Sequence, residues 1–256
     1  MRYKLLAVIA SAAIVVLTLP SAAQATHSWN GYHWARTSNP FTIKLGDNVN
    51  STWDPYLQTA SADWSQSSVL DTMVVPGQSN RNCKMTTGRV EVCNAAYGNN
   101  GWLGLATIQV TGGVHITKGS TKLNDTYFNQ AQYNTPAWHR LVMCQEVGHT
   151  FGLDHQDTNF NNPNLGTCMD YTSNPSGPPS NEHPNQHDYD ELVIIYTHLD
   201  SFTTVGQAVN GSQAAIGDTP ASWGRMVSGS AAHGGHATYV RDLGHGEMII
   251  TFVIWA

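Results

Sequence analysis

Residues 143–155, with the sequence MCQEVGHTFGLDH, constrain the fold more than any other stretch of this chain. Upstream of them, Thr135 and Pro136 provide an N-cap and a proline for the first helical turn. We therefore expect a helix that runs to Phe151 and stops at Gly152. A glycine at this place lets the chain leave a helix sharply and turn back toward it.

This helix and turn predict that four polar side chains come together. Residues i and i+4 share a face of a helix, so Gln145 and His149 point the same way, with Glu146 about 100° round the axis. The turn brings His155 back toward that face. Imidazole nitrogens are good zinc ligands, and a glutamine oxygen is a weaker neutral donor with a similar reach. The residues thus predict a metal site with Gln145, His149 and His155 as ligands and a fourth position open to water.

The spacing Glu-x-x-His-x-x-Gly-x-x-His resembles the pattern of the metzincins, which are secreted zinc peptidases, without its first histidine. Residues 149–155, HTFGLDH, resemble the matrixin version of that pattern. Gln145 before Glu146 resembles the gametolysin branch, in which Gln-Glu-x-Gly-His replaces His-Glu-x-x-His. Downstream, Cys168-Met169-Asp170-Tyr171 resembles the Met-turn of the same family.

This resemblance implies an α+β fold, a metzincin-like catalytic domain in which a twisted mixed β-sheet carries an active-site helix, a Met-turn and a C-terminal helix. It also implies one catalytic Zn²⁺ and hydrolysis of peptide bonds by metal-activated water. Glu146 would be the general base, Met169 the floor beneath the metal, and Tyr171 a group that stabilises the tetrahedral intermediate. The alternative is a catalytically inactive relative that acts as an extracellular binding protein, which the missing first histidine favours.

Residue patterns elsewhere in the chain predict strands and helices that agree with such a fold. Phe41, Ile43 and Leu45 alternate with polar residues as in a half-buried strand, and a helix is expected to begin at Asp54 and Pro55. Further strands are expected at 69–75, 90–93, 104–110 and 114–118, and a last helix at 188–200 with Tyr189, Leu192, Tyr196 and Leu199 facing inward.

Three regions are expected along the chain. Residues 1–25 have a basic start, an apolar run and an Ala-x-Ala site, which predicts a secretory signal peptide. Residues 26–200 would form the metallopeptidase domain. Residues 201–256 begin rich in Gly and Ser and end in strand-like runs, which predicts a linker and a β-rich extension. The sequence leaves open whether that extension packs on the main domain or forms a small module.

The cysteine content and the charge indicate the compartment of the protein and its possible partners. Four cysteines in an exported chain predict two disulfides, and we favour Cys83 with Cys93 and Cys144 with Cys168. Charged residues make up 12% and the net charge is −6, so we expect no nucleic-acid partner. We expect no membrane association after signal cleavage, a secreted monomer, and a protein or peptide substrate.

Histidines and aspartates outside the motif have open roles. His183 and His187 could approach the cleft, and His187 could replace Gln145 as a ligand, but we favour exposed loop or cap positions for both. Asp154 and Asp157 could accept hydrogen bonds from the ligand imidazoles, or be solvated loop residues. The three histidines of the extension lie among glycines and are interpreted as residues of flexible turns rather than a second metal site: His233, His236 and His245.

The control of activity is a further question that the sequence raises. Matrixins are typically held latent by a propeptide cysteine, and no such segment fits between Ala25 and the first strand. The enzyme is therefore active once exported, or the extension or a separate protein restrains it.

Overall fold

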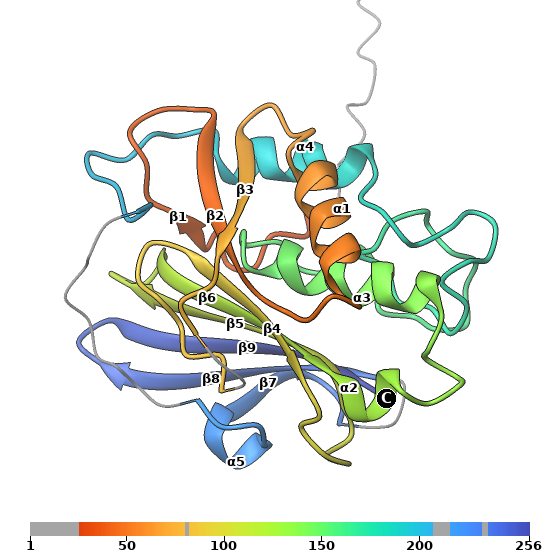
Figure 1. Cartoon of the computed structure of the whole chain (residues 1–256). Helices are drawn as coiled ribbons and strands as arrows, with labels where there is room; N and C mark the ends of the chain where they lie inside the picture. The colour runs from red at the N-terminus through yellow and green to blue at the C-terminus, as the bar shows by residue number, and fades with distance from the viewer. Residues whose placement is uncertain (1–25, 80–81, 207–215, 232–234) are drawn as a thin grey trace, which may run out of the picture.

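A twisted mixed sheet runs through the molecule, with the larger helices on one side of it (Figure 1). This computed structural model describes residues 26–79, 82–206, 216–231 and 235–256, so the predicted signal peptide lies outside the described residues. The strands in this part of the chain are β1 (His33–Trp34), β2 (Phe41–Asn48), β3 (Leu70–Pro76), β4 (Val90–Ala95), β5 (Trp102–Thr111), β6 (His115–Asn124), β7 (Arg225–Gly229), β8 (His236–Gly244) and β9 (Glu247–Trp255). The helices are α1 (Asp54–Trp64), α2 (Asp125–Phe128), α3 (Pro136–His149), α4 (Gln186–Ile195) and α5 (Pro220–Trp223).

The sheet has a parallel half and an antiparallel half. Its strand order is β3-β2-β4-β6-β5-β9-β8-β7, and β1 pairs with β6 away from this path. Strands β3, β2, β4 and β6 pair in parallel. From β6 onward each neighbour pairs antiparallel. The α+β class expected from the sequence is thus confirmed at the level of a mixed sheet with few helices.

The main core lies between the sheet and the helices α1 and α3. Helix α1 contributes Leu57, Ala60 and Trp64, all of them buried, to this core. Helix α3 begins as expected, because the Thr135 side chain accepts a hydrogen bond from the Trp138 N–H at 3.3 Å. Burial of both helices against the sheet is what stabilises them, since neither is long enough to be stable alone.

The C-terminal strands continue the main sheet. β9 pairs with β5 along its length, from Val110 with Met248 to Trp102 with Trp255. Alternate residues of β9 face opposite sides: Phe252 lies in the main core, and Val253 packs in a second cluster with Trp223 of α5. Of the two arrangements that the sequence left open, the structure has the extension packed on the main domain.

The last helix differs from the expectation. α4 begins at Gln186, where Asn185 and Asp188 form a capping box, and ends at Ile195 instead of residue 200. Just past the end of the helix, the Arg36 guanidinium donates to the carbonyl oxygens of Tyr196 and His198. The predicted inward position of Leu199 is wrong, because that side chain is exposed.

Both favoured disulfides are confirmed. Cys83 is bonded to Cys93, and Cys144 to Cys168. The second one joins α3 to the loop that carries Met169.

Among the described residues, no helix combines the length and the apolar character needed to cross a membrane.

Candidate metal centre

The second half of α3 is held in place by two tryptophans. The Trp64 indole N–H donates to the Cys144 carbonyl oxygen at 3.1 Å. The Trp34 indole N–H donates to the Thr150 carbonyl oxygen at 2.9 Å, just past the end of the helix. Both tryptophans are fully buried. The backbone of this part of the helix is therefore fixed from both the α1 side and the β1 side.

Gly152 makes the turn that the sequence predicts. Its φ is +95°, a conformation that side chains with a Cβ rarely adopt. A Cβ at this position would also collide with the Tyr32 carbonyl oxygen. The turn closes with a hydrogen bond from the Gly152 N–H to the His149 carbonyl oxygen at 3.1 Å. The chain then runs back along α3 and brings His155 to His149.

The two histidines approach each other through their Nε2 atoms. His149 Nε2 and His155 Nε2 are 2.9 Å apart, and the ring planes are inclined by 72°. His149 Nδ1 lies 2.9 Å from the Leu153 carbonyl oxygen, which can only accept. His155 Nδ1 lies 3.2 Å from Asp154 Oδ1. These partners place a proton on Nδ1 of each ring, so in their neutral forms both rings present the lone pair of Nε2 to each other.

Protonation of His149 Nε2, which would relieve its contact with His155 Nε2, is unfavourable. Burial, and next the neighbouring His155, hold the pKa of His149 well below its usual value. For Asp154, burial acts to raise the pKa, but hydrogen bonds from His155 outweigh it and the pKa is lowered. Asp154 thus stays an acceptor. Two lone pairs that face each other at 2.9 Å suit a shared cation, since tetrahedral zinc places two nitrogen ligands about 3.3 Å apart.

Gln145 lies one helical turn before His149 on α3, with its amide oriented by the Met169 loop. Its Nε2 donates to the Cys168 carbonyl oxygen at 2.8 Å, which fixes which way the amide faces. Its Oε1 is buried and has no hydrogen-bond partner within the described part of the chain. A buried carbonyl oxygen without a partner costs about 1–3 kcal/mol. A metal ion would satisfy it.

Glu146 and Tyr171 also carry buried oxygens without a partner among the described residues, namely Oε2 and the hydroxyl. Burial raises the pKa of Glu146 well above its usual value. Burial, and then the negative charges of Glu146 and Asp154, raise the pKa of Tyr171. The Tyr171 ring stacks on His155 with centroids 4.5 Å apart. Glu146 lies against Gly104 of β5, where a Cβ would come within 2.7 Å of Oε1.

Met169 is fully buried under the end of α3, with no exposed surface. A Cβ on Gly148 would lie 2.9 Å from its sulfur, so the helix approaches this side chain closely only because residue 148 is glycine. The Gln156 N–H donates to the Met169 carbonyl oxygen at 2.7 Å, which joins this loop to the segment that carries His155. The floor role remains a prediction.

The C-terminal strands cover the centre. Phe252 of β9 lies parallel to the His149 ring, at 4.2 Å between centroids and 1° between planes. His236, the first residue of β8, stacks on Tyr171 at 4.7 Å and lies 5.2 Å from His155. Burial, and then His155, lower the pKa of His236 to about 4. The exposed fractions are 0% for Gln145, 1% for Glu146, 1% for His149, 8% for His155 and 2% for Tyr171.

The interpretation of His236 as a flexible-turn residue is therefore wrong. Sequence reasoning missed both His236 and Phe252 as neighbours of the centre. The histidine among glycines was a signal, but only the β5–β9 pairing determines where it lies. His245 does sit in the turn between β8 and β9, with a φ of +54°, and His233 lies outside the described residues.

His183 and His187, which the sequence allowed to approach the cleft, have partners elsewhere. His183 Nδ1 is 2.7 Å from Asp63 Oδ2 on α1, and His187 stacks on His27 at 4.9 Å between centroids. The replacement of Gln145 by His187 as a ligand is therefore wrong.

The two aspartates that the sequence offered as acceptors behave differently. Asp154 does bond a ligand imidazole, that of His155. Asp157 instead bonds amide groups of its own loop, those of Asn159 and Asn162.

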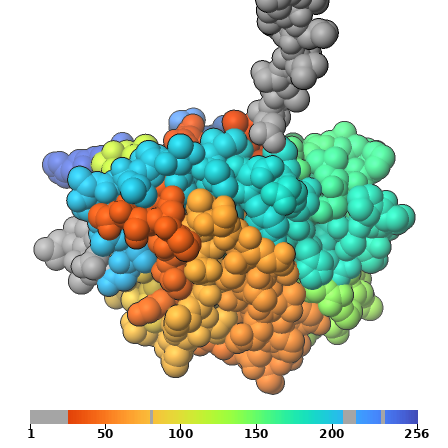
Figure 2. All heavy atoms as spheres, turned by 90° about the horizontal axis from the view of Figure 1, so that it is seen from above, coloured from red at the N-terminus to blue at the C-terminus, as the bar shows by residue number. Residues whose placement is uncertain are grey.

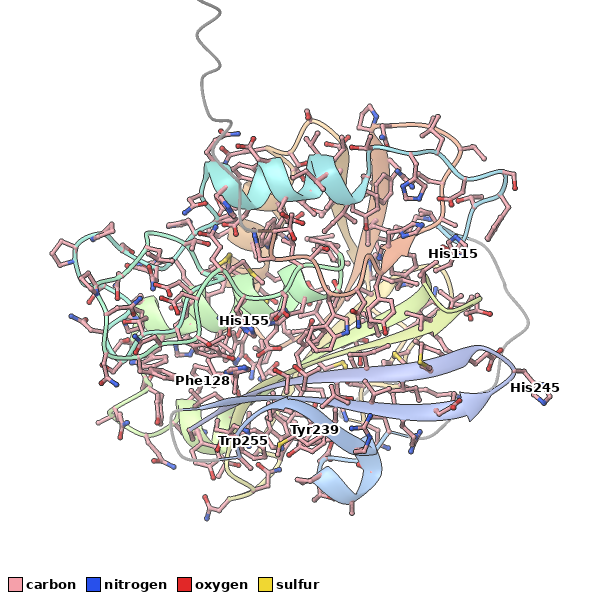
Figure 3. All side chains as sticks on the ribbon, turned by 180° about the vertical axis from the view of Figure 1, so that it is seen from behind. His115, Phe128, His155, Tyr239, His245 and Trp255 are labelled. Carbon is pink, nitrogen blue, oxygen red and sulfur yellow. A yellow bond between two sulfur atoms is a disulfide. The ribbon has the colours of Figure 1, made fainter. Side chains whose placement is uncertain are left out.

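A cavity of about 330 Å³ opens between the start of α3, the 156–186 loop and the end of β9. Its lining includes Tyr133, Trp138, Phe160, Ser173, Ile254 and Trp255. The Phe160 ring packs against Tyr171 with centroids 4.9 Å apart, which puts the cavity next to the centre. Figure 3 labels His155 and Trp255, which lie in the same half of the molecule in that view.

No protein-family model matches this chain, and no curated protein is similar to it in sequence. Among solved structures, it is similar to high choriolytic enzyme 1, a hatching enzyme zinc-protease from the medaka fish Oryzias latipes. The sequences are 10% identical, the likeness covers 64% of this chain and 94% of that chain, and the TM-score is 0.37. A similarity this low assigns neither fold nor activity, so the case for the centre depends on its own residues.

Proposed function

We propose that this protein is a secreted zinc-dependent endopeptidase whose active site is the centre at the end of α3. The observation that carries the proposal is the contact between His149 Nε2 and His155 Nε2, two ring nitrogens held 2.9 Å apart while Nδ1 of each ring faces an acceptor oxygen. Three unpartnered buried oxygens among the described residues, on Gln145, Glu146 and Tyr171, support it. The two disulfides fit an oxidising compartment.

His149, His155 and Gln145 Oε1 are the residues that would hold the ion. Bound Zn²⁺ supplies a Lewis acid that acidifies water and polarises a carbonyl group. The hydrogen bonds at His149 Nδ1 and His155 Nδ1 keep both rings in the tautomer that can bind. Gln145 is a weaker donor than histidine, so we expect a lower affinity than that of a three-histidine site.

Glu146 and Tyr171 would carry the proton and charge movements. Glu146 Oε2 takes the proton from the attacking water and passes it to the leaving amine. Burial raises the pKa of Glu146, which makes it a better base once a nearby cation keeps it ionised. The Tyr171 hydroxyl donates a hydrogen bond to the substrate oxygen as negative charge develops there.

Phe252 and His236 cover the centre, so a substrate can reach it only when at least one of these side chains moves aside. We expect His236 to be the side chain that moves, because it is the first residue of β8 and is only partly buried. This agrees with one of the alternatives from the sequence, in which the extension restrains the enzyme. The adjacent cavity is lined by aromatic side chains, so we propose that a large apolar substrate side chain binds there.

The alternative is a non-catalytic binding domain. The buried state of the centre favours it, since no peptide reaches Glu146 while Phe252 covers His149. Gln145 in place of a histidine favours it as well. The two functions differ in whether Glu146 has a chemical task.

The test is a cleavage assay with a mixed peptide library and added zinc, run with the secreted protein and with Glu146→Gln. This substitution keeps the size of the side chain and removes its basicity, so bound zinc should be retained while hydrolysis falls by about 100-fold or more. Asp190→Asn is the matched control, because it removes one negative charge on α4, where the carboxylate accepts a hydrogen bond from exposed Gln186. Zinc content is measured on all three by elemental analysis.

Each outcome separates the two functions. Cleavage that a chelator abolishes and Glu146→Gln lacks supports the peptidase, and the cut sites report whether large apolar side chains are preferred. Zinc bound by the folded wild type without any cleavage leaves a metal-binding domain. A folded protein that neither binds zinc nor cuts refutes the proposal in favour of the binding domain.

A further inference from the structure

A second group of metal-binding side chains lies away from the centre described above. His33 of β1 and His115 of β6 are register partners on adjacent parallel strands. His198 and Asp200 follow α4 and approach them from another segment. Hydrogen bonds from the Asp200 N–H to the Arg36 carbonyl oxygen and from the Thr204 N–H to the Ala35 carbonyl oxygen, both at 2.9 Å, hold that segment against the residues after β1.

The figures show the same neighbourhood. In Figure 2, the cyan residues around and after α4 lie side by side with the red and orange residues of the N-terminal segment. Figure 3 labels His115 and His155, and they lie in separate parts of the molecule. The group of His33, His198 and Asp200 is thus distinct from the candidate centre at His155.

The ligand atoms have the spacing that a metal ion needs. His33 Nε2 and His198 Nε2 are 3.1 Å apart. Asp200 Oδ1 is 3.6 Å from His33 Nε2 and 3.8 Å from His198 Nε2. Ligands of a tetrahedral zinc ion lie about 3.3 Å apart. Within the described residues, this is the one group of three His, Cys, Asp or Glu side chains whose ligand atoms all lie within 4.8 Å of one another.

Neighbouring groups orient these ligands. His33 Nδ1 lies 2.7 Å from the Gly31 carbonyl oxygen, so it carries the proton and Nε2 offers a lone pair to His198 and Asp200. The Arg36 guanidinium and its backbone N–H bind the other oxygen of Asp200, Oδ2, at 2.9 and 3.2 Å. Outer hydrogen bonds of this kind are typical of metal ligands.

His115 completes the surroundings of the group. Its Nε2 lies 3.2 Å from the same Asp200 Oδ1. It can donate to that oxygen or move by a small amount to become a fourth ligand. The His198 side chain is 53% exposed, so an ion can reach the site from solvent.

We propose that His33, His198 and Asp200 bind a divalent transition-metal ion of the zinc type, with His115 or water in the fourth position. Two imidazoles and one carboxylate suit Zn²⁺ and its spectroscopic substitute Co²⁺. The ion joins β1 and the segment after α4, which are far apart in the sequence, so its role is structural. With His115 as the fourth ligand, it also joins β6. This proposal does not depend on peptidase activity.

The test measures zinc binding by equilibrium dialysis against a competing chelator, with the full secreted chain. We expect His198→Ala to bind one equivalent fewer than the wild type, or to bind it at least about tenfold more weakly. His245→Ala changes a histidine in the exposed β8–β9 turn and should leave binding unchanged. His155→Ala should keep the equivalent that depends on His198, which separates this site from the candidate centre.

Co²⁺ gives a second readout, since tetrahedral sites produce visible absorption bands. The part of the absorption that His198→Ala loses should remain in His155→Ala. His198 is largely exposed, so its replacement is compatible with folding, which circular dichroism checks. Unchanged zinc stoichiometry and affinity in His198→Ala would overturn the proposal. Loss of the same equivalent in His155→Ala would also overturn it, because only one site would then exist.

Discussion

At the scale of single residues, the central problem of this chain is Gln145, which stands where the resemblance to the metzincins leads one to expect a histidine. Gln145 has a specific environment in the structure. Its amide nitrogen donates to the Cys168 carbonyl oxygen, and its amide oxygen is buried without a partner in the described part of the chain. Such an arrangement is unfavourable unless the oxygen has a ligand to bind. Substitution of Gln145 therefore tests whether the centre binds metal.

We expect Gln145→His to raise zinc affinity by about tenfold or more, because imidazole is a stronger donor than a neutral amide at the same backbone position. Zinc affinity is measured by competition with a chromophoric chelator. Gln186→His, on the exposed start of α4, is the control and should have no effect at this centre. Equal affinities for Gln145→His and the wild type would mean that residue 145 does not contact the ion.

At the scale of elements, the turn after α3 and the loop that carries Met169 determine the shape of the centre. The turn is formed by a glycine, and the loop is tied down by a disulfide. The chain also holds another glycine with a similar backbone conformation and another disulfide, neither of which contacts the centre. These matches allow the contribution of each feature to be measured separately.

Gly152→Ala should destabilise the protein by about 3 kcal/mol or more, because the backbone conformation is unfavourable and the new Cβ meets the Tyr32 carbonyl oxygen. Gly98 has nearly the same φ, +96° against +95°, but faces open space. Gly98→Ala should therefore cost only about 1 kcal/mol. Urea unfolding gives both values, and equal costs would show that the contact with Tyr32 is relieved by a small backbone shift.

Replacing both cysteines of either disulfide by alanine should cost about 3 kcal/mol of unfolding free energy. Only the loss of Cys144–Cys168 should also weaken zinc binding, since the Cys168 carbonyl oxygen orients Gln145. Loss of Cys83–Cys93, which ties β4 to the segment before it, should leave zinc binding unchanged. If both double variants bind zinc like the wild type, the loop keeps its position without the covalent bond.

Local features of the fold and site were predictable from the sequence, and long-range ones were not. The start of α3, the Gly152 turn and the approach of His155 follow from cap residues and helical spacing. The pairing of β9 with β5 does not, because alternation identifies a strand without naming its partner. For the same reason the sequence pointed neither to Phe252 nor to the group around His33.

At the scale of the whole molecule, the question is whether residues 26–200 form a domain by themselves. β9 is an interior strand of the sheet, and Ile250, Phe252 and Ile254 fill the main core. A chain that ends at residue 206 would expose the edge of β5 and lose these side chains.

We expect the fragment 26–206 to show no cooperative unfolding transition in urea, because the exposed apolar surface would outweigh its remaining stability. Adding residues 216–256 as a separate chain should restore the transition by supplying β9. Far-UV circular dichroism follows both experiments. Cooperative unfolding of 26–206 alone would instead make residues 207–256 a dispensable addition, as the sequence expectation of separate regions implies.

The interior place of β9 also has a consequence for biosynthesis. β5 and α3 leave the ribosome long before residues 247–255, so a growing chain has no partner for one edge of β5 until those residues follow. Residues 248–256, MIITFVIWA, carry no charged side chain and have a strong tendency to form β-structure, which makes them prone to self-association while unpaired. The sheet closes late, around the very strand that covers His149. Under the proposed function, a nascent chain would thus stay free of hydrolytic activity against itself and its neighbours through most of its synthesis, because the candidate centre is finished only together with its cover.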